Sequence, residues 1–146
     1  MRIIGCGNRE RSDDGAGVLV AERLREWGLE AETLTGEALA LIEAWSGAHD
    51  VIVVDAVATG SPVGTVQVWE ARPYLLPGRS STSTHGFGVA EAIELARTLD
   101  RLPQRLRVYG IEGRQFELGS DVSPEVKRAV EEVARQIAVQ AGKCRS

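Results

Sequence analysis

The chain has 146 residues, of which 43% are hydrophobic and 26% are charged, and its net charge is −4 at pH 7. A chain of this length can bury one hydrophobic core, and this composition excludes collagen-like, mucin-like and wholly disordered proteins. Because no apolar run approaches the roughly 18 residues that a membrane-spanning helix needs, we expect no membrane partner.

The first part of the chain predicts strands that alternate with helices. The predicted strands cover Arg2–Cys6, Glu30–Leu34 and Val51–Val54, and the predicted helices cover Gly15–Trp27 and Glu37–Trp45. Four β-branched residues in Val51–Val54 indicate a strand buried on both faces, and we expect it to end at Asp55. Asp13 and Asp14 precede the first helix, where its N-terminal end favours negative charge.

The second part of the chain continues this alternation after a turn at Ser61–Gly64. The predicted elements are a strand at Thr65–Trp69, a long connection at 71–83, a helix at Phe87–Leu99, a strand at Leu106–Ile111 and a final helix. Ser123 at the N-cap and Pro124 at the first helical position predict where that last helix begins. The sequence therefore predicts one α/β domain over residues 1–146, with a mostly parallel sheet of about five strands.

Charge and cysteine content limit the partners and the compartment. The 17 basic residues form no basic patch of the kind that binds phosphates, so nucleic acid is not an expected partner. The nearest basic residues are interpreted as a solvated turn and strand edge: Arg101, Arg105 and Arg107. Cys6 and Cys144 form no C-x-x-C pair, and Cys144 lies in a tail expected to be flexible over about 141–146. Since the start of the chain does not resemble a signal peptide, we expect a cytoplasmic, reduced protein.

Three segments are expected to end at one edge of the sheet, because the carboxyl ends of strands form the binding crevice in open α/β sheets. They are the turn Gly5–Asn8, Asp55 after the clearest strand, and Thr84–Gly86 before a helix. Asp14, Asp55 and His85 can therefore converge, although they are far apart in the sequence. Two carboxylates and one imidazole suit a divalent transition metal and leave positions open for substrate or water.

Each of these residues also has a simpler explanation. A pair of acids before a helix can be a cap and dipole partner, an Asp after a strand is a common turn residue, and a His beside Gly can lie in an exposed loop. Asp55, however, precedes the apolar residues 56–58, so its carboxylate needs a partner. His49 is explained by a surface turn at the start of a strand.

Several common motifs are absent from the sequence. It contains no H-E-x-x-H, no G-x-S-x-G and no G-x-x-x-x-G-K-[ST] motif. A dinucleotide-binding turn after the first strand is also disfavoured, because the third glycine of G-x-G-x-x-G would fall at Glu10, whose carboxylate would face pyrophosphate. Cys6 is interpreted as a small packed residue at the end of a buried strand, not as a nucleophile.

An ordered set of short motifs runs along nearly the whole chain. It comprises Gly5-x-Gly7-Asn8, Asp13-Asp14-Gly15-x-Gly17, Val53-Val54-Asp55-Ala56, Thr84-His85-Gly86, Gly110-Ile111-Glu112 and Ser123-Pro124-Glu125-Val126. This set resembles the hydrogenase maturation proteases, which remove a C-terminal extension from the large subunit of nickel–iron hydrogenase. The resemblance implies a three-layer sandwich in which a twisted sheet carries helices on both faces.

The resemblance also implies a function and a site. It assigns metal contact and catalysis to Asp14, Asp55 and His85. It implies an endopeptidase that acts on the large-subunit precursor after nickel insertion and recognises the bound nickel. We therefore expect nickel carried by the substrate and no organic cofactor. We also expect a monomer, because the sequence shows no extended apolar surface stripe.

Two loops depart from the family pattern. Thr35–Glu37 stands where many members have an Asp-Gly-Gly type of turn, and Gly113 stands where many have proline after Ile-Glu. Both loops are expected to border the substrate, and the candidate substrate-loop residues are Asn8, Glu37 and Arg114. We expect Gly113 to loosen its loop, since it lacks the restriction that proline places on φ.

Two other functions remain open at this point. One is a metal-dependent hydrolase that acts on an unrelated peptide or small molecule and holds its own zinc or manganese. The other is a non-catalytic maturation chaperone that docks the precursor without cleaving it. Bound metal in the purified protein would favour the first, and a complex without cleavage would favour the second.

Overall fold

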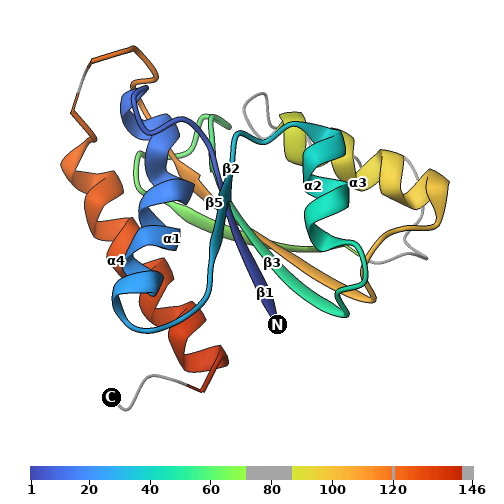
Figure 1. The fold of residues 1–146 in the computed structure, drawn as a ribbon. Coiled ribbons are helices and arrows are strands. Elements are labelled where there is room, and N and C mark those ends of the chain that lie inside the picture. Colours follow the sequence, from blue (N-terminus) through green and yellow to red (C-terminus); the bar gives the residue numbers. More distant parts are fainter. Residues whose placement is uncertain (72–86, 120, 143–146) are drawn as a thin grey trace.

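The computed structural model describes residues 1–71, 87–119 and 121–142, and in this part of the chain five strands form one sheet (Figure 1). The sheet has the strand order β2-β1-β3-β5-β4. The strands are β1 (Arg2–Cys6), β2 (Glu32–Leu34), β3 (Asp50–Val57), β4 (Val66–Ala71) and β5 (Arg105–Glu112). All neighbours pair in parallel except β4, which runs antiparallel to β5. The predicted mostly parallel sheet is therefore confirmed.

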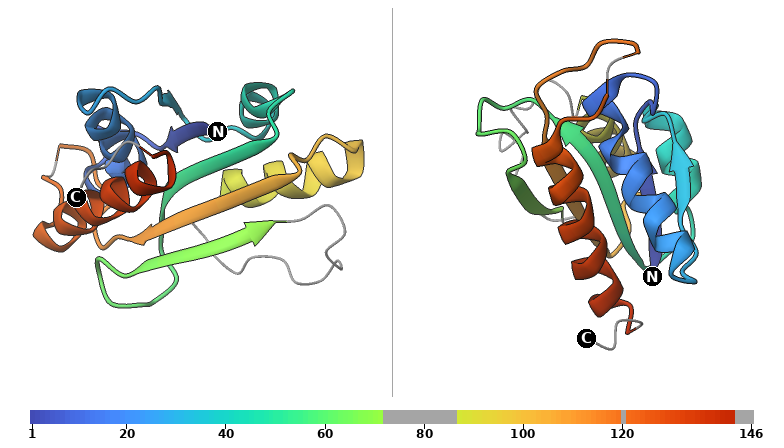
Figure 2. Two further views of the ribbon diagram at one scale, coloured as in Figure 1. Left: turned by 90° about the horizontal axis from the view of Figure 1, so that it is seen from below. Right: turned by 90° about the vertical axis from the view of Figure 1, so that its left-hand side faces the viewer.

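Helices cover both faces of this sheet, as Figures 1 and 2 show. The helices are η1 (Ser12–Gly15, a 3-10 helix), α1 (Ala16–Glu26), α2 (Ala38–Trp45), α3 (Phe87–Leu99) and α4 (Pro124–Gln140). Helices α1 and α4 pack on one face, and α2 and α3 pack on the other. The molecule is thus the three-layer sandwich that the family resemblance implies.

The central strand β3 contributes to a hydrophobic core on each side of the sheet. Ile52 and Val54 point toward α1 and α4, whereas Val51 and Val53 point toward α2 and α3. All four side chains are fully buried. This explains why the strand has a continuous apolar sequence instead of an alternating one.

Two details differ from the sequence-based predictions. Strand β3 does not end at Asp55 but continues to Val57, because β5 extends alongside it and pairs Val57 with Glu112. Arg107 is not at a solvated edge; it lies in β5, is 8% exposed, and donates a hydrogen bond to Asp50 at 3.0 Å. A neighbouring acid thus allows this cation to be buried within the sheet.

Two other expectations concern the membrane and the end of the chain. Among the described helices, none is both long and apolar enough to cross a membrane. Helix α4 ends at Gln140, and Cys144 and most of the tail expected to be flexible lie outside the described residues.

Candidate active site

Asp14 is held at the end of β1 by the turn that follows this strand. It lies in η1, is half-buried, and accepts hydrogen bonds from the Asn8 amide at its side-chain Oδ2 (3.1 Å) and at its carbonyl oxygen (3.2 Å). Gly7 makes this contact possible, since its φ is +134° and a Cβ there would lie 2.0 Å from the Asp14 carbonyl oxygen. The Gly7–Asn8 turn therefore sets the place of the Asp14 carboxylate.

Asp55 comes from the carboxyl-terminal part of β3. Its side chain is 7% exposed, and its Oδ1 accepts one hydrogen bond from the described residues, from the Ala56 amide at 2.8 Å. Burial raises the pKa of Asp55 well above its ordinary value, the Ala56 N–H opposes that rise, and the charge of Asp14 adds to it. A carboxylate in this environment gains from a nearby proton or cation.

The structure brings Asp14 and Asp55 together at one edge of the sheet. Both acids lie close enough to Cys6 for their negative charges to raise the pKa of its thiol. Burial of the thiol raises this pKa by more than either charge does. Packing explains this proximity: a Cβ at Gly17, near the start of α1, would lie 2.3 Å from the Val54 carbonyl oxygen and 2.4 Å from that of Cys6. Helix α1 thus begins against the ends of β1 and β3, where the sequence predicts the crevice.

His85 lies outside the described residues, so its place in the site stays a prediction. The helix that follows it does reach the same edge. A Cβ at Gly88, in the first turn of α3, would lie 2.0 Å from the carbonyl oxygen of Gly36, and a Cβ at Gly36 would lie 3.9 Å from the Cys6 Cβ. Within the described ranges, no three His, Cys, Asp or Glu side chains are grouped as a metal site.

The three candidate substrate-loop residues are all exposed. Asn8 lies beside Asp14, as described above. Glu37 is the N-cap residue of α2, but its side chain accepts no capping hydrogen bond there. Arg114 forms an ion pair with Glu125 at 3.0 Å, and its amide donates to the carboxylate of Asp13. Exposure and position at this edge agree with a role in substrate contact, which stays a prediction.

Asp13 is a site residue whose place the sequence does not reveal. A role as helix cap and dipole partner was one explanation for this residue. Asp13 lies in the first turn of η1, but it is fully buried and its hydrogen-bond partners are distant in the sequence. Its carboxylate accepts hydrogen bonds from the amides of Arg114, Gln115 and Ser123 and from the Ser123 hydroxyl. The Ser123 hydroxyl is therefore used by Asp13 and does not cap α4, although Ser123 is the N-cap residue as predicted.

Gly113 does not loosen its loop, contrary to expectation. Its amide donates to the Val57 carbonyl oxygen at 3.0 Å, a bond that proline could not make. A Cβ at this position would lie 2.8 Å from the Cβ of Asp13 and 2.9 Å from the ring of Phe116. Glycine is therefore required here for close packing, and the loop is tightly held at this point.

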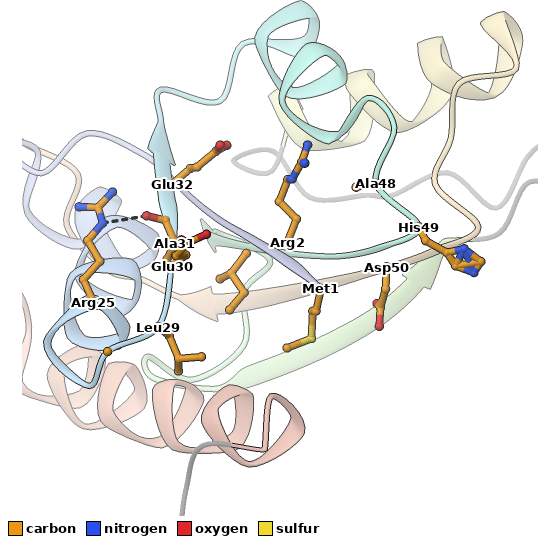
Figure 3. Close-up of a pocket in the computed structure, with 12 residues that line it drawn as sticks. Met1, Arg2, Arg25, Leu29, Glu30, Ala31, Glu32, Ala48, His49 and Asp50 are labelled. Atoms are coloured by element: carbon orange, nitrogen blue, oxygen red, sulfur yellow. Dashed lines mark hydrogen bonds between the residues drawn. The ribbon is translucent and has the colours of Figure 1, made fainter.

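A hollow opens at the opposite, amino-terminal edge of the sheet (Figure 3). It is lined by the first residues of three strands, Arg2, Glu32 and Asp50, together with neighbours that include Arg25 and His49. Neither Asp14 nor Asp55 lines it. Its charges are mixed in sign, so it does not compete with the carboxyl-terminal edge as the candidate active site.

Two of the three predicted site side chains, Asp14 and Asp55, lie at the carboxyl-terminal edge of the sheet. Asp14 and Asp55 present carboxylate oxygens, a type of ligand that divalent cations bind, and burial beside the charge of Asp14 raises the pKa of Asp55. A histidine supplied by the segment before α3 would complete a set of two carboxylates and one imidazole. Such a set leaves coordination positions open for a peptide carbonyl or water.

Comparisons with known proteins agree with this fold. Residues 28–140 match the model of the family described as hydrogenase maturation protease. The chain is 31% identical over 121 residues to protein FrxA of Pyrococcus furiosus, which covers 81% of this chain and 88% of FrxA. It is 28% identical over 141 residues to the hydrogenase expression/formation protein HoxM of Cupriavidus necator, and this match covers 91% of this chain and 69% of HoxM.

The solved structure of the NiFe hydrogenase maturation protease HybD from Thermococcus kodakarensis superimposes closely on this one. The TM-score is 0.75 at 25% identity, and the match covers 97% of this chain and 99% of that protein. The family match spans most of the chain, and the structural match spans nearly all of it. The chain therefore belongs to the hydrogenase maturation protease family and is a peptidase of that family.

Proposed function

We propose that this peptidase removes the C-terminal extension of a nickel–iron hydrogenase large-subunit precursor after nickel has been inserted. In this proposal Asp14, Asp55 and His85 contact the nickel that the precursor carries. Membership of the family supports a hydrogenase precursor as the substrate. The name of HoxM, a hydrogenase expression/formation protein, points to the same process.

The observation that carries this proposal is the state of Asp55. Its carboxylate is buried beside the negative charge of Asp14, and one backbone N–H is its partner among the described residues. Two carboxylates so placed cost free energy when both are ionised. A divalent cation bound by both carboxylates would remove that cost, and in this proposal the cation is the nickel that the precursor carries.

The chemistry is the hydrolysis of one peptide bond. The oxygen of water adds to the scissile carbonyl carbon, the bond from that carbon to nitrogen breaks, and the released amine takes a proton. Nickel held in the precursor can act as a Lewis acid that polarises the carbonyl or activates the water. The side chains of Asp14, Asp55 and His85 would bind and orient that nickel, and the Asn8 amide would hold Asp14 in place.

We also propose a cofactor requirement, an oligomeric state and a compartment for the protease. The protease would carry no organic cofactor and would obtain nickel with the precursor. It would act as a monomer in the cytoplasm. Size-exclusion chromatography with light scattering measures the oligomeric state, and cell fractionation measures the compartment.

The test is processing of a co-purified large-subunit precursor, prepared from cells grown with and without nickel and followed by intact mass. We expect the mass of the C-terminal extension to be lost from the nickel-loaded precursor only. Equal cleavage of both precursors would contradict nickel recognition. Stoichiometric zinc or manganese in the purified protease would instead favour a hydrolase with its own metal, and a stable complex without cleavage would favour a chaperone.

A further inference from the structure

The strongest unassigned feature of the site edge is the hydrogen bonding of Asp13. Its carboxylate is fully buried and receives four hydrogen bonds within 2.7–3.0 Å. Three come from backbone amides of the segment between β5 and α4, and one comes from the hydroxyl of Ser123. All of these donors lie 101 to 110 residues away along the chain.

Further bonds join the same two segments around Asp13. The Asp13 amide donates to the Gln115 carbonyl oxygen (2.9 Å), the Ser12 hydroxyl donates to the Asp121 carbonyl oxygen (2.7 Å), and the Gly119 amide donates to the Glu10 carbonyl oxygen (3.1 Å). Residues 10–13 thus form one hydrogen-bonded unit with residues 114–119 and 121–123, and the Asp13 carboxylate lies at its centre.

This unit carries Asp14, which the proposed function places at the nickel, and Arg114, a candidate substrate-loop residue. Asp14 follows Asp13 directly, and Arg114 donates its own amide to the Asp13 carboxylate. The position of the Asp14 carboxylate is therefore set from two sides, by the Asn8 amide and by the anchored neighbour Asp13. A shift of Asp13 would move Asp14 relative to both Asp55 and the backbone at Arg114.

We propose that Asp13 is a positioning residue for the proteolysis. It contacts neither substrate nor metal; it fixes the turn that presents Asp14 against the loop that presents Arg114. This inference rests on the proposed function, because it assumes that Asp14 acts on the precursor. A carboxylate suits the role, since its two oxygens can accept several N–H groups whose directions are fixed by the backbone.

The test compares kcat and KM for nickel-loaded precursor among matched variants. Asp13→Asn keeps the size of the side chain but places an NH₂ group among donors. Asp50→Asn is the control for lost stability, because it removes the charge from a partly buried ion pair with Arg107 at the opposite edge of the sheet. Both are assayed at a temperature where thermal unfolding curves show them to be folded, and rates are normalised to folded protein.

We expect Asp13→Asn to lower kcat by about 10- to 100-fold, as is typical when a residue that orients a ligand is lost, and to change KM much less. Asp50→Asn should keep the kcat of the unmodified protein. A normal kcat in Asp13→Asn, or an equal loss in Asp50→Asn, would overturn the proposal.

A second variant keeps the test decisive if Asp13→Asn does not fold. Ser123→Ala removes the hydroxyl donor and leaves the three amide donors in place, and we expect a several-fold fall in kcat. An unchanged kcat in that variant would overturn the proposal. Asp14→Ala is assayed beside it: full activity of Asp14→Ala would refute the proposed site itself, whereas inactive Asp14→Ala with fully active Asp13 and Ser123 variants would refute only this inference.

Discussion

Asp13 and Asp55 lie at the same edge of the sheet with exposed fractions of 0% and 7%, and they differ in how their charges are compensated. The carboxylate of Asp13 accepts four hydrogen bonds, and that of Asp55 accepts one from the described residues. Burial raises the pKa of Asp13, but the N–H and hydroxyl donors outweigh it and lower the pKa below its ordinary value. At Asp55 burial prevails and the pKa is raised.

This difference separates a structural acid from a functional one. A buried carboxylate whose oxygens are satisfied by donors holds segments together and has little capacity left for a ligand. A buried carboxylate without compensation lowers the stability of the fold, and such residues concentrate at functional sites. In the proposed function, Asp13 stabilises one corner of the site and Asp55 binds the cation.

The largest expected effect is that of Asp55→Asn. The variant keeps an oxygen for the Ala56 amide but loses the charge, so we expect nickel-dependent processing to fall at least about 100-fold, as for loss of an electrostatic catalytic group. The measurement is the rate of precursor cleavage by intact mass. A rate close to that of the unmodified protein would remove Asp55 from the site.

The same variant should be more stable than the unmodified protein at neutral pH. Because the folded pKa of Asp55 is raised, the folded state binds the proton more tightly, and stability falls as the pH rises from about 3.9, the unfolded value, toward the folded pKa. Asp55→Asn removes that loss, so its free energy of unfolding in urea should be higher at pH 7. A clear decrease would show that the charge of Asp55 is compensated after all.

Asp13→Asn should have the opposite effect on stability. It leaves buried donors without an acceptor, and we expect a loss of about 3 kcal/mol and a fall in Tm of about 10 °C. Because the folded pKa of Asp13 is lowered, its contribution is complete above about pH 4 and is lost as the pH falls through the folded pKa. The gap between the two proteins should therefore narrow in acid, and a constant gap would argue against an ionised Asp13.

Gly113→Ala should disturb the Asp13 corner by packing alone. The new Cβ would lie 2.8 Å from the Asp13 Cβ, and overpacking of this kind costs about 1–3 kcal/mol. Thermal unfolding measures the loss. The control is Gly28→Asn, where a Cβ meets nothing within 4 Å and φ is +89°, a conformation that Asn tolerates. Equal losses in both variants would mean that the contact with Asp13 is not the cause.

Cys6→Ala should have the smallest effect on activity. Burial, and then the charges of Asp55 and Asp14, raise the pKa of this thiol, so it is not the thiolate that a nucleophile requires. We expect processing within about threefold of the unmodified rate and a loss of stability of about 1 kcal/mol, as for removal of a small buried group. Loss of turnover in a folded Cys6→Ala protein would show that the thiol takes part.

The sequence was sufficient for those features that depend on local pattern. The run Val51–Val54 indicates a strand buried on both sides, and the rule that ligands bind at the carboxyl ends of strands predicts the meeting of Asp14 and Asp55. The predicted end of β3 was wrong by two residues, because the end of this strand depends on its pairing with β5.

The role of Asp13 could not be predicted in the same way. Its donors lie more than 100 residues away, so an acid that holds a loop and an acid that caps a helix have the same local sequence. The burial of Arg107 was missed for a related reason, since its partner Asp50 lies on the neighbouring strand. Gly113 shows that a departure from a family pattern can tighten a loop. The effect of this residue depends on the side chains of Asp13 and Phe116, which lie against it.

The most direct test of nickel recognition uses the only two histidines of the chain, His49 and His85. The measurement is cleavage of nickel-loaded precursor, by intact mass, in His85→Ala and His49→Ala proteins shown to be folded. We expect His85→Ala to lose nickel-dependent cleavage and His49→Ala, at the opposite edge of the sheet, to retain it. Full cleavage by His85→Ala would contradict a site made of two carboxylates and this imidazole.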